Sequence, residues 1–405
     1  MNQMSRFDER LHNRKLALFQ LLEAIGRELD LNPSRRADAE TRYTAVSTWL
    51  IGSDDPRLQS TLVFLAGSTA IGTNVRPLGG EEHDVDLMSV LLGLGADASP
   101  SEVKALIGRR LRENARYADI IEEMARCWRI VYANEFHLDI TPAIRNPSCP
   151  NGGLLVPDKE LRRWKLSHPK GFRDRFDGRA LLVPRFRTEL QKNALTADRG
   201  SVEPYPTYNP VKGVLRRTAQ LLKRHRDVYF EDKPGLSPPI SIVITELAAR
   251  AYEHLVKNHI FENEFDLLLH IVKMLPIFID ERPATHGKWA VWNHATQGEN
   301  FAEKWNRDRA RADAFFQWQR VAEAGFGRLV DIEGRDAIAE ELRLMLGARA
   351  VNKVLDDQTG EISVAREKQS LWVAPKVGLV TTAPGFAAAP VRANTFFGRE
   401  DDDPS

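Results

Sequence analysis

The stretch that most constrains this chain of 405 residues is 60–90, where two apolar segments flank a turn and a loop. The first segment ends at Gly67-Ser68, and the second carries Asp84 and Asp86. Side chains of a strand alternate between its faces, so the two aspartates should project together. Adjacent carboxylates repel each other unless a cation lies between them. Ligands that are all oxygen suit a hard divalent ion, and we expect Mg²⁺ or Mn²⁺ at this strand.

A third carboxylate follows on a segment that we expect to be a neighbouring strand. Residues 136–140 alternate apolar and polar side chains, which puts His137 and Asp139 on one face. Together with residues 128–133 they predict a hairpin around Asn134-Glu135. Two aspartates or a Gly-Ser turn alone are weak signals. Their combination with a third aspartate predicts a metal site beside a turn whose N–H groups can bind a phosphate.

This arrangement resembles the nucleotidyltransferase superfamily of the DNA polymerase β type. More narrowly, it resembles the cGAS/DncV-like nucleotidyltransferases (CD-NTases) of bacterial CBASS anti-phage systems. The resemblance implies an α+β fold, in which a nucleotidyltransferase lobe with a twisted mixed sheet faces an α-helical lobe across the active-site cleft. It implies that Asp84, Asp86 and Asp139 are catalytic and hold two Mg²⁺ or Mn²⁺ ions, and that Gly67 and Ser68 bind the nucleotide phosphates.

The basic segment 211–230 is predicted to be a helix of the second lobe. The family has a lysine on this helix that contacts the triphosphate, and Lys223 matches it. A single ammonium can neutralise phosphate charge without a fixed bidentate geometry. For Arg224 and Arg226 we expect an ordinary solvated helix face, because basic residues are good helix formers.

The next predicted helix, residues 240–254, starts with a nearly continuous apolar surface that indicates burial. Ser241 matches a family serine that reaches the nucleotide from the helical lobe. Several relatives follow this serine with an aromatic residue that stacks on the base, whereas this chain has Ile242. Base stacking is therefore expected to be weaker or to come from other residues, with Tyr205 and Tyr208 as candidates.

Helical periodicity also predicts helices at 6–29 and 35–50, with Ser34 as the N-cap of the second, and at 307–324 and 335–347 to finish the helical lobe. Composition changes divide the chain into five predicted segments. They are N-terminal bracing helices (1–55), the nucleotidyltransferase core (56–150), an extended connector (151–205), the helical lobe (206–372) and a flexible C-terminal tail (373–405). The tail is rich in Ala, Pro and Gly, and Phe396-Phe397 is its candidate site for a protein partner.

Composition narrows the class of protein. The 57 basic and 56 acidic residues leave a net charge of +1, which disfavours a protein that coats nucleic acid. Cys127 and Cys149 form no C-x-x-C pair, so a zinc ribbon is excluded and a reducing compartment fits. Because no apolar run approaches the roughly 20 residues that span a bilayer, we expect a cytoplasmic protein without membrane contact.

The residues alone predict metal-dependent nucleotidyl transfer. The resemblance implies more, namely a cyclic di- or trinucleotide second messenger made from NTPs, with ATP, GTP or both as substrates and no requirement for nucleic acid. One alternative is a nucleotidyltransferase that acts on an RNA or protein acceptor. The other is a catalytically inactive scaffold that binds nucleotide, although a scaffold has no use for three clustered acids.

Overall fold

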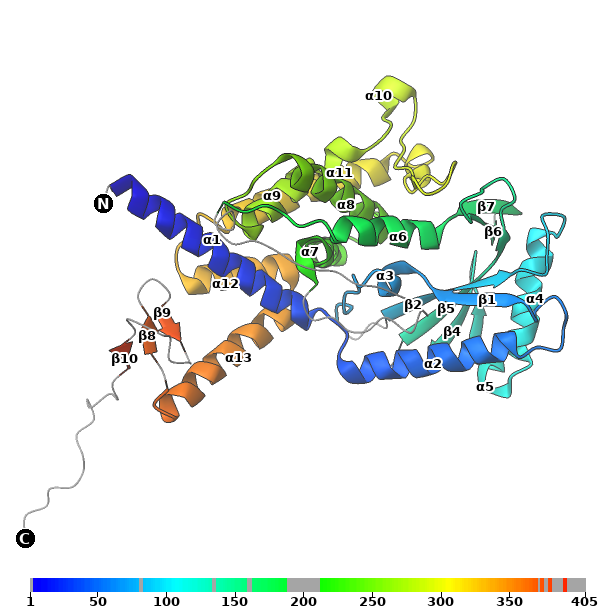
Figure 1. Cartoon of the computed structure of the whole chain (residues 1–405), viewed down its shortest axis with the longest axis horizontal. Helices are drawn as coiled ribbons and strands as arrows, with labels where there is room; N and C mark the ends of the chain where they lie inside the picture. The colour runs from blue at the N-terminus through cyan, green and yellow to red at the C-terminus, as the bar shows by residue number, and fades with distance from the viewer. Residues whose placement is uncertain are drawn as a thin grey trace, which may run out of the picture.

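A mixed sheet and a bundle of helices lie next to each other in this computed structural model, with the sheet at the lower right of Figure 1 and the bundle at the upper left. The structure describes residues 3–79, 83–132, 136–158, 162–187, 212–370, 372–374, 378–380 and 389–391. No helix within these ranges is long and apolar enough to cross a membrane.

The sheet positions the acidic residues through one parallel strand pair. Its strand order is β1-β2-β5-β4-β3, and β6 extends it by pairing with the far end of β5 and with β7. Among these neighbours only β2 and β5 run parallel, while the other described pairs are antiparallel. The strands are β1 (Thr61–Leu65), β2 (His83–Leu91), β3 (Ile121–Glu123), β4 (Trp128–Tyr132), β5 (Phe136–Arg145), β6 (Leu154–Asp158) and β7 (Arg163–Ser167).

One face of the sheet is covered by helices, and the other is turned toward the bundle. Figure 1 shows α2 running under the sheet on the side away from the bundle. α2 (Pro33–Ile51), α4 (Pro100–Arg112) and the short α5 (Ala115–Ala118) share a buried apolar core with the strands. Side-chain oxygens of Asn32 and Ser99 accept the backbone N–H groups of Arg35 and Glu102, so α2 and α4 both begin at capped ends.

The bundle has its own larger core, built around the buried helices α7 and α8. The N-terminal helix α1 (Gln3–Glu28) packs into this core, whereas α2 packs on the sheet, so the two predicted bracing helices serve different lobes. The other helices are α6 (Pro169–Ala180), α7 (Gly213–Glu231), α8 (Ser241–Asn258), α9 (Glu264–Met274), η1 (Leu275–Phe278), α10 (Pro283–His286), η2 (Glu303–Asn306), α11 (Ala310–Arg328), α12 (Arg335–Leu346) and α13 (Ala348–Glu367).

Three local expectations were wrong. The N-cap of α2 is Asn32 rather than Ser34, because Pro33 occupies the first helical position. The bundle does not end at 347, since α13 continues from Gly347, whose φ of 87° turns the chain between two helices. Finally, residues 154–180 are not simply an extended connector. They form the strands β6 and β7, which belong to the sheet, and the helix α6.

The division into five segments stays a prediction. Within the predicted tail and its border, the structure describes the short paired strands β8 (Trp372–Ala374), β9 (Gly378–Val380) and β10 (Ala389–Pro390). Tyr205, Tyr208 and Phe396-Phe397 lie outside the described residues.

Candidate active site

The parallel strand pair brings the predicted acidic residues into register. On β2 and β5, Asp86 is the Cα partner of Asp139, and Asp84 is the partner of His137. Nδ1 of His137 lies 3.3 Å from Oδ1 of Asp84. Val85, between the two aspartates, is fully buried on the opposite face, as strand alternation predicts. The sheet therefore presents its carboxylates together on the face turned toward the bundle.

The Gly-Ser turn lies directly against this acidic face. The N–H of Ala66 donates to the carbonyl oxygen of Asp86 at 2.9 Å, and α3 (Gly67–Ala70) begins at the next residue. Gly67 has a φ of 60°, and a Cβ atom added to it would collide with Oδ2 of Asp86. Only glycine allows this approach. A phosphate bound by the backbone of Gly67-Ser68 would thus lie next to the carboxylate of Asp86.

Arg129 is the cation of the acidic face, and no sequence pattern singled it out. It is the Cα partner of Asp139 across the β4–β5 hairpin. Its Nε and Nη2 bind the two oxygens of Asp139 at 2.7 and 2.8 Å, and Nη2 also lies 3.2 Å from Oδ1 of Asp84. These bonds, led by the one to Asp139, raise the pKa of Arg129 above its usual value. Asp139 is therefore held by a guanidinium instead of facing the cleft alone.

Asp86 is where a further cation would be most favourable. Burial, followed by the charges of Asp139 and Asp84, raises the pKa of Asp86 to about 6. Within the described part of the chain, no three acidic, histidine or cysteine side chains form a ready metal site. The donor set nevertheless fits a hard divalent ion, because Asp84 and Asp86 supply carboxylate oxygens from one strand and Asp139 is their immediate neighbour. Metal ligation by these three residues stays a prediction.

Lys223 reaches the sheet lobe from the bundle. Its Nζ donates to Oγ1 of Thr73 at 2.8 Å and to the carbonyl oxygen of Thr73 at 3.2 Å, in the loop after the Gly-Ser turn. Burial lowers the pKa of Lys223 to about 7. Gln220, one turn earlier on α7, donates to the carbonyl oxygen of Asn74 in the same loop. α7 therefore clamps the loop that follows Gly67-Ser68.

The expectation that Arg224 and Arg226 lie on a solvated helix face was wrong. Arg224 is buried and donates to the carbonyl oxygen of Arg76. Arg226 points across to α8, where its Nη1 donates to Oγ of Ser241 at 2.9 Å and to the carbonyl oxygen of Pro239 at 3.0 Å. The two side chains are held there because carbonyl and hydroxyl oxygens, and for Arg226 also the carboxylate of Asp227, accept hydrogen bonds from them.

A cavity of about 960 Å³ lies between the two lobes. Pockets that hold small molecules typically have volumes of roughly 300–1,000 Å³, so this one is large enough for a nucleotide. Both walls contribute, and the predicted site residues that line it are Gly67, Ser68, Asp84, Asp86, Lys223 and Ser241. Asp139 is the exception, since it lies beside Arg129 and not among the lining residues.

The far end of the cavity is lined by residues that the sequence did not single out. They come from β7, α6 and the loop before η2, and include Ser167, Phe172, Asn293, Glu299 and Phe301. No periodicity separates them from core residues, because their common position arises only when distant segments fold together. Ile242 of α8 lines the same cavity.

Three comparisons relate this geometry to known proteins. A family model described as the Second Messenger Oligonucleotide or Dinucleotide Synthetase domain (SMODS) matches residues 18–179, the range that contains Gly67-Ser68 and all three aspartates. The c-di-GMP synthase of Roseivirga ehrenbergii is 26% identical over 399 residues, which cover 95% of this chain and 98% of that protein. The cyclic dinucleotide synthase CdnG of Bradyrhizobium diazoefficiens is 24% identical over 407 residues, covering 93% and 94% of the two chains.

Similarity extends to the solved structure of the same CdnG in complex with GTP. It superposes with a TM-score of 0.64 at 20% sequence identity, over 84% of this chain and 98% of that one. At this level of identity the superposition shows that the two proteins share a fold.

Proposed function

We propose that this chain is a cGAS/DncV-like nucleotidyltransferase (CD-NTase) and that it makes a cyclic dinucleotide from GTP. The predicted polymerase β-like α+β fold is confirmed. The observation that carries the proposal is the single cavity in which the Gly-Ser turn, the paired aspartates, Lys223 and Ser241 meet. The names of the two curated relatives support a dinucleotide product, and the GTP complex of one supports the base. The family resemblance supports a second-messenger role in anti-phage defence.

The reaction would be nucleotidyl transfer carried out twice. A ribose hydroxyl oxygen of one nucleotide attacks the α-phosphorus of a second, and a new P–O ester bond forms. The bond between that phosphorus and the oxygen that bridges to the β-phosphate breaks, so pyrophosphate leaves with the electron pair. The hydroxyl proton passes to a base or to water. A second transfer within the linear dinucleotide closes the ring and releases a second pyrophosphate.

The chain's own groups would hold the donor nucleotide from both sides. The backbone and hydroxyl of Gly67-Ser68 bind terminal phosphates from the sheet lobe, while Lys223 and Ser241 approach them from the bundle. Arg129 fixes the orientation of the Asp139 carboxylate through two parallel hydrogen bonds. CD-NTases depend on divalent metal, and we propose two Mg²⁺ or Mn²⁺ ions held by Asp84, Asp86 and Asp139, which would neutralise charge on the reacting phosphate.

The test is product analysis on purified, nuclease-treated protein. Incubation with GTP, ATP or both, in Mg²⁺ or Mn²⁺, should yield a cyclic dinucleotide by mass spectrometry from GTP alone and no product in a chelator. Nuclease treatment should not reduce the yield, because nothing in the proposed reaction needs a polynucleotide. Extension of added RNA instead of a cyclic product, or activity that appears only with a polynucleotide, would refute the proposal.

A further inference from the structure

A polar corner lies at the end of the cavity, where β7 meets the loop before η2. The carboxylate of Glu299 occupies it. Oγ of Ser167 donates to Oε1 at 3.0 Å, while the N–H of His168 and Nδ2 of Asn293 donate to Oε2 at 3.0 and 2.7 Å. Ser167, Asn293 and Glu299 all line the cavity. The corner is thus a half-buried carboxylate held in one orientation from three directions.

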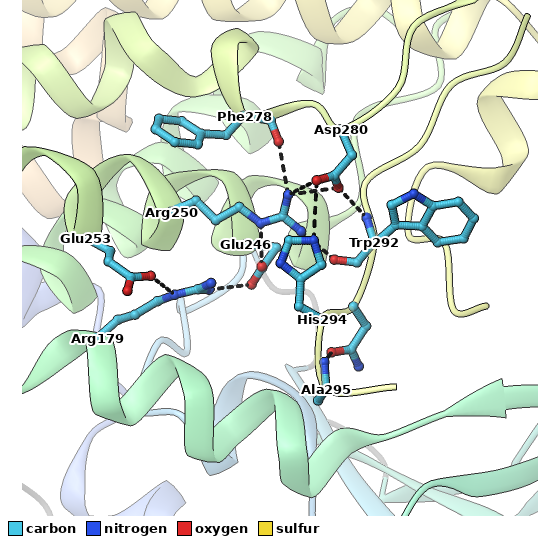
Figure 2. Close-up of polar contacts among 10 residues, drawn as sticks. Arg179, Glu246, Arg250, Glu253, Phe278, Asp280, Trp292, His294 and Ala295 are labelled. Atoms are coloured by element: carbon cyan, nitrogen blue, oxygen red, sulfur yellow. Dashed lines mark hydrogen bonds and ion pairs between the residues drawn. The ribbon is translucent and has the colours of Figure 1, made fainter. Parts of the chain in front are cut away.

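Buried ion pairs in the bundle fix the loop that carries this corner, as Figure 2 shows. Arg250 of α8 binds both oxygens of Asp280 at 2.8 Å and also donates to the carbonyl oxygen of Trp292. Asp280 in turn accepts the N–H of Trp292 at 2.7 Å. The carboxylate of Glu246 links two arginines: its Oε1 pairs with Nε of Arg250 at 2.6 Å, and its Oε2 pairs with Nη1 of Arg179 of α6 at 3.0 Å.

The carbonyl oxygen of Trp292 is therefore anchored to Arg250 of α8, and its N–H to Asp280, which Arg250 also binds. Asn293 follows Trp292 directly. Oδ1 of Asn293 accepts the N–H of Ala295 at 3.0 Å, which leaves its amide nitrogen directed at Glu299. Such a corner is preorganised, so a ligand that binds it does not have to order the loop.

The walls beside the corner suit a flat aromatic ligand. Phe172 of α6 and Phe301 line the cavity, with ring centroids 5.6 Å apart at an interplanar angle of 90°. Ile242 and Thr245 of α8 line it as well. Aromatic and aliphatic surfaces close to a single carboxylate are typical of pockets that bind a base by its faces and read it by its edge.

The carboxylate has capacity for one more donor. An ionised carboxylate offers about four acceptor sites, and three are occupied here. The unoccupied one is on Oε1. Guanine presents two adjacent donors, N1–H and the 2-amino group, on its Watson–Crick edge. Adenine presents only its 6-amino group there, next to the lone pair of N1, which a carboxylate repels.

We propose that Glu299 is a specificity-determining residue whose Oε1 accepts a hydrogen bond from N1–H or the 2-amino group of guanine. It disfavours adenine, whose N1 lone pair would face the carboxylate. This inference rests on the proposed function, because it places the base of a substrate nucleotide at this corner. Burial raises the pKa of Glu299, and its hydrogen-bond donors oppose that rise. A bound guanine edge would add to those donors and favour the ionised carboxylate.

The test measures binding separately from turnover. Affinities for α,β-methylene analogues of GTP and ATP, which cannot transfer their nucleotidyl group, are compared in Mg²⁺ for the native protein and Glu299→Gln. A site built for a hydrogen bond rejects analogues that lack it, so the native protein should prefer the GTP analogue. Glu299→Gln should reduce the ratio of affinities by about tenfold or more through weaker GTP-analogue binding, with ATP-analogue binding nearly unchanged.

Glu303→Gln is the matched control. It makes the same chemical change four residues later, where the carboxylate pairs with Lys165 outside the cavity, and it should leave the ratio unchanged. If Glu299→Gln does not fold, Glu299→Asp retains the charge but withdraws the carboxylate by one methylene, and it should also lower the ratio. An unchanged ratio, an equal loss of both analogues, or a native protein without guanine preference would overturn the inference. A protein that shows the preference but forms no cyclic product would refute only the proposed function.

Discussion

The two walls of the cleft hold their charges in different ways. On the sheet wall, Asp84, Asp86 and Asp139 share one close guanidinium, that of Arg129, so negative charge remains in excess. On the bundle wall, Lys223 and Arg226 each donate to fixed oxygens of neighbouring segments. The sheet wall therefore carries negative charge that is not neutralised, whereas the two basic side chains of the bundle wall already have hydrogen-bond partners.

This difference indicates what each wall can contribute. An excess of carboxylates at close range gains free energy from an added cation, so the sheet wall should respond strongly to metal. Side chains already held by hydrogen bonds need little reorganisation when a phosphate arrives, so the bundle wall should act by position. The contrast predicts larger effects from changes to the sheet wall than from changes to the bundle wall.

Removing charge from the sheet wall should have the largest effect. The double change Asp84→Asn with Asp86→Asn keeps shape but removes two negative charges, and product formation should fall to background. Because repulsion is relieved, the melting temperature of the metal-free protein should stay the same or rise. The stabilisation by Mg²⁺ with GTP should shrink, since ligand stabilisation follows affinity. Melts with and without metal, paired with product assays, check this, and remaining turnover would contradict the two-metal proposal.

Arg129→Gln should separate stability from metal binding. Loss of its charge-assisted bonds to Asp139 should lower the free energy of unfolding of the metal-free protein by about 1–3 kcal/mol. Mn²⁺ should bind more tightly, because the metal no longer competes with a guanidinium for Asp84 and Asp139. Urea unfolding and Mn²⁺ titration followed by electron paramagnetic resonance measure the two effects. Weaker Mn²⁺ binding in the variant would show that Arg129 supports the metal site instead of competing with it.

On the bundle wall, Lys223→Met should weaken GTP binding by about 1–3 kcal/mol, the range for a charge-assisted contact. The pKa of Lys223 is about 7 in the folded chain and 10.5 ordinarily, so its burial costs stability as pH falls from about 10.5 toward 7. A triphosphate beside it should raise that pKa again, and binding at about pH 8 should take up a proton. Calorimetry in phosphate and Tris buffers measures the uptake, which should be absent in the variant.

The neighbouring Arg226 sharpens this test. The sequence alone predicts that Arg226→Ala costs much less than loss of Lys223. In the structure Arg226 positions Oγ of Ser241 and lines the cavity, so we now expect a measurable loss of GTP affinity without a change in proton uptake. Identical effects of the two substitutions on affinity and uptake would mean that Lys223 has no special contact with the triphosphate.

The smallest effect concerns the back of the same helix. His225 is buried, accepts the indole N–H of Trp318 at 3.0 Å, and has its pKa lowered by burial to about 4. As the pH falls, His225 is protonated in the unfolded chain before it is protonated in the folded one. The free energy of unfolding should therefore fall as the pH drops from about 6.5 to 4. His225→Gln keeps an acceptor but does not titrate, and it should reduce the pH slope of unfolding by at most about one proton. Urea midpoints at several pH values give the slope.

Most of the sheet wall could be predicted from residue order. Alternation along a strand is a local property, so the common face of Asp84 and Asp86 and the buried Val85 followed directly from residue order. The main helices of the bundle also followed from periodicity, with boundaries shifted by a few residues. The resemblance to a family supplied Lys223 and Ser241, which no physical pattern singles out.

The register between β4 and β5 decided which residue lies beside Asp139, and the predicted register was wrong by one residue. A two-residue turn at Asn134-Glu135 would put Ile130 opposite Asp139, whereas the observed register pairs Tyr132 with Phe136 and therefore Arg129 with Asp139. A register shift of one residue exchanges the faces of a strand, so a guanidinium replaces an apolar side chain beside the carboxylate.

Tertiary structure alone decided the bundle wall and the far corner of the cleft. Whether a basic residue on a helix meets water or a carbonyl oxygen depends on which segment packs against that helix, and this placed Lys223 against Thr73 and Arg226 against Ser241. Glu299 meets Ser167 across 132 positions of sequence. Contacts at such separation leave no local pattern, because the free energy that forms them comes from burying the whole core rather than from the residues next to them in the chain.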